Sequence, residues 1–438
     1  MKQNENAYRT YGFFDGQNMH NFKIPQKRIL KYEIAATIKP FSNVQDAFLK
    51  RLENPCGTEA ISRQVRPGSK VVILCDDYTR PTPSHLLLPI LLDKLNELGV
   101  PDSNITILVA AGHHREMTNE EKDAKYGQAV KRVKIVHHFS CDEKNLVKIG
   151  RAGTGIDIFV NRLAVEADYR IALGIVEIHP WAGFAGGGKI VAPGIAGKKT
   201  IDQMHALPVL PSVGIGKVHD NPFWLTLTEA ADMLPLNLII NCLLDIDNQL
   251  IGLATGHPRE AQLQLIDKFK KVNELRFDEP ADIVITSAYP KYQLWPQAAI
   301  SLYNTARIVK PGGVRITLAA CPEGLGDCPH EEGFYYRSFT TAHDSPEHYW
   351  QNWLGKDAVN SRNTCAAHKL LCDSQKSEGI IVSKNLPHGM INQPVLPDIE
   401  AAIDYAFSKC GREAKVAVFD KGGMVLASLK EQVKKEKL

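Results

Sequence analysis

The chain has 438 residues, two to three times the length of a typical domain of about 150 residues. Hydrophobic residues make up 44% and charged residues 23%, so the composition is that of a globular protein and excludes a disordered chain, a collagen and a long coiled coil. The formal net charge of +3 is too small for the basic surface that a nucleic-acid or membrane partner requires.

Cysteine usage and apolar runs bear on location. The nine cysteines form an odd set without the spacing of a disulfide framework, which predicts reduced thiols in a cytoplasm. Residues 1–16 contain no apolar stretch of signal-peptide length. The longest apolar run, 86–92, is far shorter than the roughly 20 residues that span a bilayer. We therefore expect a soluble cytoplasmic protein, of an oligomeric state that the sequence does not indicate.

Buried strands and helical stretches alternate from residue 69 onward. The run 71–75 (VVILC) reads as a strand, 83–99 as a helix that ends at a glycine, and 105–111 as the next strand. A strand–helix–strand unit is typical of a parallel sheet with crossover helices. The following elements are strands at 133–138, 169–176 and 237–244 and a helix over 198–207.

A second series of elements follows the polar stretch 268–282. It contains strands at 282–289, 314–320 and 380–385, helices at 297–309 and 399–411, and a hairpin over 415–429 that turns at 421–423. The pattern predicts an α/β protein of two α/β domains with largely parallel sheets, joined near residues 270–280. We expect residues 1–275 to form an N-terminal cofactor-binding and catalytic domain, and residues 276–438 a C-terminal α/β domain that contributes substrate contacts.

Ligands of open parallel sheets bind beyond the carboxyl ends of the strands, so the loops there are the places to search. The first such loop, 76–83, carries Asp76, Asp77 and Arg80, which can hold a hydroxylated or anionic ligand. An alternative of equal weight is that one aspartate caps the following helix while Arg80 pairs with a carboxylate.

The second loop, 112–115, contains adjacent histidines. Histidine titrates near neutrality, so His113 at a strand end is an acid/base candidate. Two adjacent side chains of an extended backbone point to opposite sides, so at most one of His113 and His114 is expected to serve chemistry. A structural role remains the commoner one for any single histidine.

The third loop, 177–194, is the richest in special residues. Gly183 to Lys189 spells G-x-x-x-x-G-K, the pattern of a phosphate loop, and its glycines let backbone N–H groups approach a phosphate closely. However, Ile190 stands where a serine or threonine would bind magnesium, and 190–194 (IVAPG) would interrupt the helix that such a loop begins. Lys189 is also a candidate covalent handle.

The motifs together resemble one family. The segments DDYTRPTP (76–83), GHHR (112–115) and HPWAGFAGGGKIVAPG (179–194), followed by His205, resemble the nickel-dependent lactate racemase family in content and order. The segment YPKYQLWPQA (289–298) is similar to that family's second-domain segment, so the resemblance spans both halves of the chain.

The resemblance implies a nickel-pincer nucleotide, pyridinium-3,5-bisthiocarboxylic acid mononucleotide nickel, covalently attached at Lys189. It implies His205 as the protein's nickel ligand and His113 and His179 as the acid/base residues on opposite faces of the substrate. The remaining implied contacts are Asp77, Arg80, Gly186, Gly187 and Gly188 at the cofactor, and Arg80 and Gln297 at the substrate. Because these residues come from both halves, we expect the active site in the cleft between the domains.

The implied reaction is the racemisation or 2-epimerisation of an α-hydroxy acid by reversible hydride transfer to the cofactor. One departure concerns the substrate: the lactate enzymes carry a lysine three residues after the glutamine, where this chain has Ile300. Loss of that cation should weaken binding of a small carboxylate by about 1–3 kcal/mol. We therefore expect a substrate other than lactate, such as a longer acid or a sugar acid. Trp350 or Trp353 matches the family's second-domain tryptophan.

Two other functions remain open from the residues alone. A phosphoryl-transfer enzyme would use Gly183 to Lys189 and require magnesium-dependent nucleotide hydrolysis. A non-catalytic binding protein would retain its biological activity without His113 or His179. The resemblance implies a small-molecule 2-hydroxy acid and the cofactor-maturation enzymes as partners. It also implies that protein made in a heterologous host can lack the cofactor.

Overall fold

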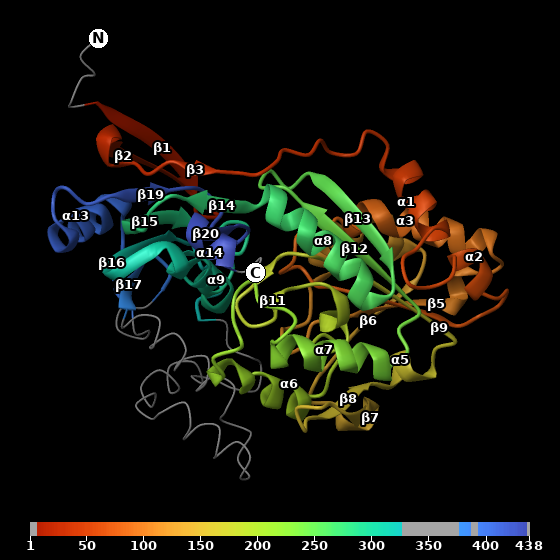
Figure 1. The fold of residues 1–438 in the computed structure, drawn as a ribbon. Coiled ribbons are helices and arrows are strands. Elements are labelled where there is room, and N and C mark those ends of the chain that lie inside the picture. Colours follow the sequence, from red (N-terminus) through yellow and green to blue (C-terminus); the bar gives the residue numbers. More distant parts are fainter. Residues whose placement is uncertain (1–6, 326–375, 387–392, 436–438) are drawn as a thin grey trace. The chain divides into compact units, whose positions relative to one another are not determined.

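The computed structural model describes residues 7–325, 376–386 and 393–435. These residues form two compact units (Figure 1). Residues 38–269 form one, the central unit. Residues 7–37 and the described residues from 270 onward form the other, the terminal unit. None of the helices within these ranges is long and apolar enough to cross a membrane.

The central unit is built on a six-stranded sheet of order β13-β12-β9-β4-β5-β6. All neighbours in it are parallel except β13, which pairs antiparallel with β12 at one edge. The strands are β4 (Val71–Cys75), β5 (Ile105–Val109), β6 (Lys134–His137), β9 (Tyr169–Ile175), β12 (Leu238–Leu244) and β13 (Leu250–Gly256). The first five confirm predicted strands, and four of them, β4, β5, β9 and β12, are largely buried and mainly apolar, as is typical of strands inside a parallel sheet.

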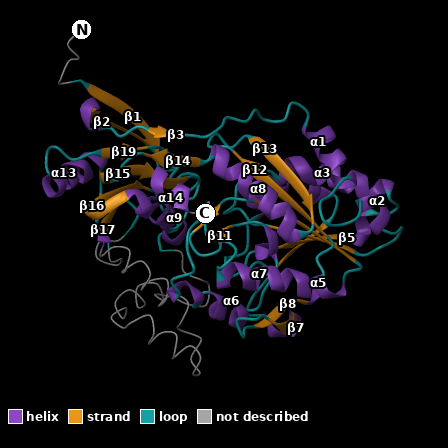
Figure 2. Ribbon diagram, in the orientation of Figure 1, coloured by secondary structure: helices purple, strands orange, loops and turns teal. Residues whose placement is uncertain are grey.

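Helices and two short antiparallel pairs complete the central unit (Figure 2). The helices are α1 (Val44–Glu53), α2 (Ile61–Gln64), α3 (Ser84–Glu97), α4 (Asn119–Tyr126), α5 (Arg162–Glu166), α6 (Lys198–Met204), α7 (Pro222–Met233) and α8 (Pro258–Val272). The pairs are β7 (Leu146–Arg151) with β8 (Asp157–Asn161), and β10 (Ile178–His179) with β11 (Gly183–Phe184). The hydrophobic core contains buried side chains of α1 and α3 in one cluster with those of β4 and β5.

The terminal unit contains a five-stranded, wholly parallel sheet of order β18-β17-β16-β15-β19. A three-stranded sheet, β20-β14-β3, and the hairpin β1-β2 accompany it. The strands are β1 (Tyr8–Phe14), β2 (Met19–Pro25), β3 (Tyr32–Glu33), β14 (Glu274–Phe277), β15 (Ala281–Ser287), β16 (Val309–Leu318), β17 (Ser377–Val382), β18 (Val395–Leu396), β19 (Val416–Val418) and β20 (Leu426–Leu429). Its helices are α9 (Trp295–Thr305), α13 (Ile399–Cys410) and α14 (Lys430–Lys435).

The predicted hairpin over 415–429 is wrong. β19 joins the five-stranded sheet beside β15, whereas β20 pairs in parallel with β14. The glycine turn between them is fixed to β15, since the Gly422 N–H donates to the Ser287 carbonyl over 2.9 Å. The turn therefore carries the chain from one sheet to another instead of folding it back on itself.

The first 37 residues differ from the expected domain limits of 1–275 and 276–438. β3 pairs with β14, and Phe13, Phe22 and Ile24 pack in one hydrophobic cluster with β15 and β16 of the terminal unit. Residues 7–37 thus belong to the terminal unit, residues 38–269 form the central unit, and the chain returns to the terminal unit near Lys270, within the predicted linker region. That region is ordered secondary structure, the end of α8 followed by β14.

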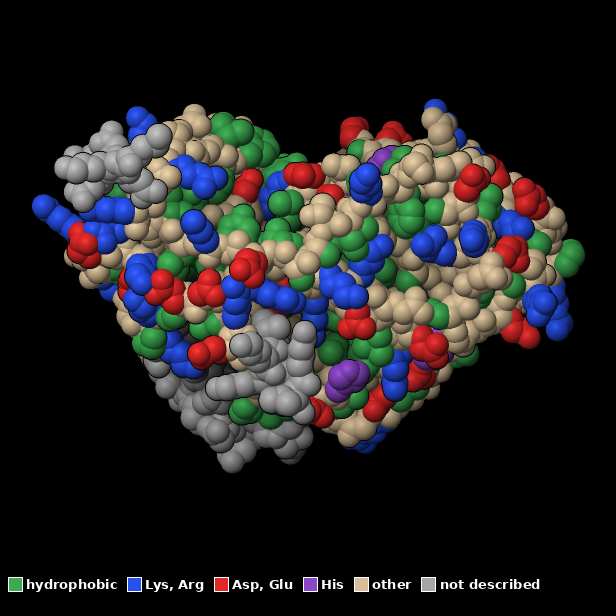
Figure 3. Space-filling view, turned by 45° about the horizontal axis from the view of Figure 1, so that its top comes forward, with side chains coloured by type: hydrophobic (Ala, Val, Ile, Leu, Met, Phe, Trp, Pro, Cys, Tyr) green, Lys and Arg blue, Asp and Glu red, His purple; other side chains and the backbone are tan. Residues whose placement is uncertain are grey.

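Charges of both signs are interspersed over the face of the molecule shown in Figure 3, with no large area of one sign. This distribution agrees with the small net charge of +3.

Candidate active site

The predicted site loops follow β4, β5 and β9, which are adjacent and parallel in the order β9-β4-β5. Their carboxyl ends therefore meet at one edge of the central sheet. The loops there are 76–83, 110–118 and 176–197, and they contain every predicted site residue except His205, which directly follows α6, and Gln297. This is the edge at which parallel sheets bind ligands.

Asp77 anchors the loop after β4. Its Oδ1 accepts hydrogen bonds from the Thr79 backbone N–H (3.1 Å) and hydroxyl (2.5 Å), and its Oδ2 lies 2.5 Å from Nδ1 of His114. Burial works against the charged form of Asp77, but the charge and hydrogen bond of His114, with the charge of Arg80, outweigh it and hold the pKa of this carboxyl well below its usual range. Asp77 is therefore a fixed negative charge at neutral pH.

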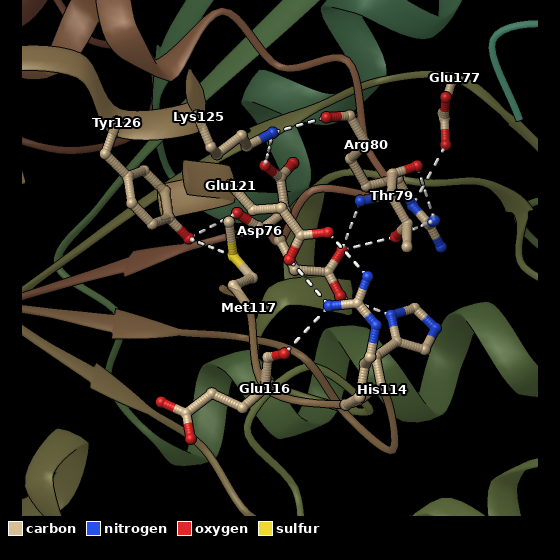
Figure 4. A network of polar contacts seen from close by, with 12 residues as sticks. Asp76, Thr79, Arg80, His114, Glu116, Met117, Glu121, Lys125, Tyr126 and Glu177 are labelled. Atoms are coloured by element: carbon tan, nitrogen blue, oxygen red, sulfur yellow. Dashed lines mark hydrogen bonds and ion pairs between the residues drawn. The ribbon is translucent and has the colours of Figure 1, made fainter. Parts of the chain in front are cut away.

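Asp76 pairs with a buried lysine from α4 (Figure 4). Its Oδ1 lies 2.7 Å from Lys125 Nζ, and its Oδ2 accepts the Thr82 hydroxyl hydrogen bond. Burial raises the pKa of Asp76, while the charge of Lys125 opposes the rise. Lys125 also donates to the Arg80 carbonyl over 2.6 Å, so this ion pair holds the loop that carries Arg80.

Arg80 points toward Glu177, which follows β9 (Figure 4). The Arg80 Nε lies 3.4 Å from Glu177 Oε1, and Nη1 donates to the Thr79 hydroxyl over 2.9 Å. The expectation that Arg80 pairs with a carboxylate is thus confirmed. The expectation that Asp76 or Asp77 caps the following helix is wrong, because the first turn of α3 receives no side-chain cap hydrogen bond.

The adjacent histidines of the second loop have separate partners. His114 contacts Asp77, whereas His113 Nδ1 lies 2.7 Å from the Ser140 hydroxyl and its Nε2 lies 3.5 Å from Asp202 Oδ1. Gly112 fixes the loop by donating its N–H to the Gly194 carbonyl (2.8 Å). The second loop is thereby joined to the segment that follows Lys189.

His179 and His205 lie around the same two aromatic rings. The Trp181 ring centre is 6.0 Å from that of His179 and 5.0 Å from that of His205, and Phe223 lies within 6.1 Å of both. His179 Nδ1 accepts hydrogen bonds from the backbone N–H groups of Trp181 (3.2 Å) and Ala182 (3.1 Å). In the neutral ring the proton of His179 is therefore on Nε2.

His205 has the opposite tautomer. Its Nδ1 lies 2.7 Å from the Ile201 carbonyl oxygen, which can only accept, so Nδ1 carries the proton and Nε2 carries the lone pair. A backbone carbonyl that orients one ring nitrogen is the usual support of a histidine metal ligand. Within the described ranges no group of three or more His, Cys, Asp and Glu side chains is placed to hold a metal ion.

The glycines of the third loop are required by close packing. A Cβ on Gly188 would lie 2.0 Å from the Leu227 carbonyl oxygen, and one on Gly187 would lie 2.5 Å from Gln262 Oε1. Gly186 has a φ of +85°, a conformation that favours glycine. Lys189 follows them within a four-residue 3-10 helix, Gly187–Ile190.

This geometry does not favour a phosphate-loop nucleotide enzyme. A phosphate loop joins a parallel strand to the N-terminus of a helix whose dipole faces the phosphate. Here Gly183 belongs to the two-stranded pair β10-β11, and the lysine is inside a short 3-10 turn.

Gln297 and Ile300 are both buried on α9 of the terminal unit. Trp350 and Trp353 lie outside the described residues. Three residues without a predicted role, Ser140, Glu177 and Asp202, contact the predicted site residues. Ser140 and Glu177 each follow a strand of the sheet, and Asp202 lies one helical turn before His205. These positions in the sequence could have marked them as neighbours of the site.

Comparisons with known proteins identify the family of the chain. The family described as Lactate racemase N-terminal domain matches residues 15–216. The lactate racemase of Lactiplantibacillus plantarum is 33% identical over 397 residues, which cover 89% of this chain and 92% of that protein. The lactate racemase of Thermoanaerobacterium thermosaccharolyticum is 34% identical over 330 residues, 73% of this chain and 75% of that protein.

Two solved structures are similar to this chain in fold. The lactate racemase apoprotein from Thermoanaerobacterium thermosaccharolyticum matches with a TM-score of 0.82 and 29% identity, covering 96% of this chain and 100% of that chain. A protein from Thermotoga maritima shares the fold, with a TM-score of 0.70 at 19% identity over 90% of this chain and 100% of that one. The chain therefore belongs to the lactate racemase family and is an isomerase.

Proposed function

We propose that this chain is a racemase or 2-epimerase of an α-hydroxy acid other than lactate, and that it works with a nickel-pincer nucleotide tethered to Lys189. The observation that carries the proposal is the tautomer of His205. Its Nδ1–H is held by the Ile201 carbonyl, so Nε2 presents a lone pair to a metal ion. Imidazole nitrogen is a good ligand for nickel(II).

The surroundings of His205 fit the nucleotide. Trp181 and Phe223 pack beside the imidazole and leave it only 8% exposed, which limits water around a bound metal. Lys189 is half-buried on the tightly packed glycine loop, a rigid base for a covalent tether. When bound, the nucleotide would accept and return the hydride of the substrate's α-carbon.

The chain's own residues would move the hydroxyl proton. In its neutral form His179 carries a proton on Nε2, which it can donate to a substrate oxygen. His113 has its Nδ1 at the Ser140 hydroxyl, so its Nε2 is the nitrogen that would exchange a proton with the substrate. An acid and a base on two faces of a planar keto acid allow the hydroxyl to be regenerated with either configuration, and the two roles swap with the starting enantiomer.

Arg80 would hold the substrate carboxylate. The guanidinium is fixed from one side by Glu177 and Thr79, and a fixed fork of N–H donors matches the two oxygens of a carboxylate. Ile300 supplies no second cation at the position where the lactate enzymes have lysine. The substrate proposal, a longer acid or a sugar acid, is supported by this difference, since additional hydroxyl groups can replace the lost contact.

The tether and the metal ligand can be tested separately. The protein should be made together with the cofactor-maturation enzymes and analysed by intact mass, visible absorbance and nickel content. Wild type and Lys199→Ala, whose lysine is exposed on α6, should show the added mass and an absorbance band, and Lys189→Ala should show neither. His205→Ala should keep the added mass on Lys189 while its nickel content falls.

The absence of added mass on wild-type protein made with active maturation enzymes would contradict the proposal. Magnesium-dependent hydrolysis of a nucleoside triphosphate that Lys189→Ala abolishes would instead support the phosphate-loop alternative.

A further inference from the structure

The helix that leads to His205 also presents a carboxylate to His113. Asp202 lies on α6 and is only 3% exposed, and its Oδ1 is 3.5 Å from His113 Nε2. Its other oxygen, Oδ2, accepts a hydrogen bond from Lys198 Nζ over 2.7 Å, one turn earlier on the same helix. The carboxylate is thus fixed between a lysine and the predicted acid/base histidine.

We propose that Asp202, held by Lys198, is a positioning residue that stabilises the protonated form of His113. The inference rests on the proposed function, in which His113 takes the hydroxyl proton of the substrate. A base in a buried site becomes positively charged when it accepts that proton, and an opposite charge within about 4–6 Å favours the charged form.

The orientation of the His113 ring supports this role. Ser140 holds Nδ1 at 2.7 Å, which leaves Nε2 as the nitrogen that faces both the carboxylate and the place of proton exchange. Ser140 is in turn fixed by α6, because its carbonyl accepts the Lys198 backbone N–H over 2.8 Å. Helix α6 therefore bears on both the ring orientation, through Lys198 and Ser140, and the charge beside the ring, through Asp202.

The separation of 3.5 Å indicates action through charge. It exceeds the 2.7–2.9 Å of a strong charge-assisted hydrogen bond. Asp202 can therefore stabilise a proton that His113 Nε2 has accepted, without itself being the base that takes the proton from the substrate. Among the described residues, Asp202 of α6 is a charged side chain that faces His113, and Lys198 of the same helix contacts Asp202. His114 on the same loop is directed to Asp77, and the loop after β6 contributes the neutral Ser140.

The inference can be tested without cofactor, by NMR titration of the histidine side chains in the full-length protein. His113→Gln identifies the His113 resonance. Asp202→Asn should lower the pKa of His113 by about one unit, a tenfold loss of proton affinity, because the neighbouring negative charge is gone. Lys198→Met should raise the pKa of His113, because the positive charge that offsets Asp202 is gone.

Asp168→Asn is the matched control. It also removes one carboxylate, but Asp168 precedes β9 at the amino end of the sheet, where it accepts the Lys70 backbone N–H. The pKa of His113 should stay within about 0.2 of wild type in this variant. Opposite shifts in Asp202→Asn and Lys198→Met support the inference, since a general loosening of the site would move both variants in one direction.

An unchanged pKa of His113 in both variants, or a shift of the same sign in both, would overturn the inference. If Asp202→Asn does not fold, Lys198→Met decides alone, because its side chain is 26% exposed and its removal leaves no buried cavity. In cofactor-loaded enzyme, the limb of the kcat profile that reports His113 should move with the NMR pKa. Opposite NMR shifts in a fully loaded protein that inverts no hydroxy acid would refute the proposed function and leave the Asp202–His113 coupling intact.

Discussion

His138 shows how strongly a partner decides what a histidine does. It follows β6, as His113 follows β5, but its Nε2–H donates to the Ala196 carbonyl over 2.8 Å and its Nδ1 accepts from the Asn161 amide over 3.1 Å. Burial lowers the pKa of His138 to about 4. The side chain is therefore a neutral link between the end of β6 and the segment that precedes α6.

This burial predicts a loss of stability in mild acid. The unfolded chain binds a proton on His138 near pH 6.5, whereas the folded protein resists it until about pH 4, so the unfolded state holds more protons between these values. The contribution of neutral His138 to the free energy of unfolding is at its full value above about pH 7. It decreases by up to about 3 kcal/mol as the pH approaches 4. His138→Gln keeps a hydrogen-bonding side chain and should flatten this part of the profile.

Urea unfolding of wild type and His138→Gln at pH 7.5 and 4.5 measures the effect. The difference in unfolding free energy between wild type and His138→Gln should become smaller or change sign at the lower pH. A difference in unfolding free energy that is independent of pH would contradict the assignment.

Among the elements, the loop between β11 and the 3-10 helix Gly187–Ile190 requires glycines because neighbouring elements pack closely against it. Asn241 of β12 accepts the Gly187 N–H at 3.4 Å, and Gln262 of α8 donates to the Ala185 carbonyl at 3.0 Å. Two elements far apart in the sequence thus hold the loop from which Lys189 projects. Its rigidity is a property of this packing.

Gly188→Ala should therefore destabilise the central unit. The added Cβ would lie 2.0 Å from the Leu227 carbonyl oxygen, and the backbone of α7 would have to move, at a cost of about 1–3 kcal/mol. Gly214→Ala is the control, since the nearest atom to its Cβ would be 3.7 Å away on a flexible lysine. Differential scanning calorimetry should show a Tm lower by about 3–10 °C for the first variant and within about 2 °C of wild type for the second. Equal Tm values for both variants would show that the loop is not tightly packed.

The sequence predicts elements better than their partners. The strands β4, β5, β9 and β12 are recognisable because they are largely buried on both faces and mainly apolar. The hairpin over 415–429 could not be corrected from local pattern, because the alternative partner of β20 is β14, some 150 residues earlier in the chain. A glycine turn specifies that the chain bends, and the tertiary structure decides which strands then pair.

The same reason limits prediction of the site. Motifs at the carboxyl ends of strands indicated His113, His179 and Lys189 from the printed sequence, and the family resemblance added His205. The groups that orient these residues, such as the Ser140 hydroxyl, the Asp202 carboxylate and the Ile201 carbonyl, become apparent only when the chain is folded. Their effect on tautomer and charge depends on distances of a few ångströms, which no spacing in the sequence contains.

In the whole molecule, the central unit is inserted between two parts of the sequence that together form the terminal unit. The core cluster of the central unit draws its buried members from residues 48–253, whereas Phe13, Phe22 and Ile24 belong to the core of the terminal unit. A division of the chain at 275 would therefore leave the first 37 residues without their hydrophobic partners.

Two fragments test this organisation. Residues 38–272 retain a complete core and all of α8, so this fragment should give a dispersed NMR spectrum and a cooperative thermal transition. Residues 1–275 carry the same core but expose the three apolar side chains, so this fragment should bind the dye ANS more strongly. Equal dye binding by both fragments, or no cooperative transition of 38–272, would contradict the division into units.

In the proposed reaction the enzyme inverts the α-carbon of a 2-hydroxy acid, with His113 and His179 as the proton-transfer pair. The most direct measurement is chiral chromatography after incubating cofactor-loaded enzyme with single enantiomers from a panel that includes lactate, longer 2-hydroxy acids and sugar acids. We predict that a longer or polyhydroxylated acid is inverted at carbon 2 faster than lactate, and that the rates are at least about 100-fold lower in His113→Ala and in His179→Ala. Failure of fully loaded wild-type enzyme to invert any acid of the panel, or full turnover by either histidine variant, would contradict it.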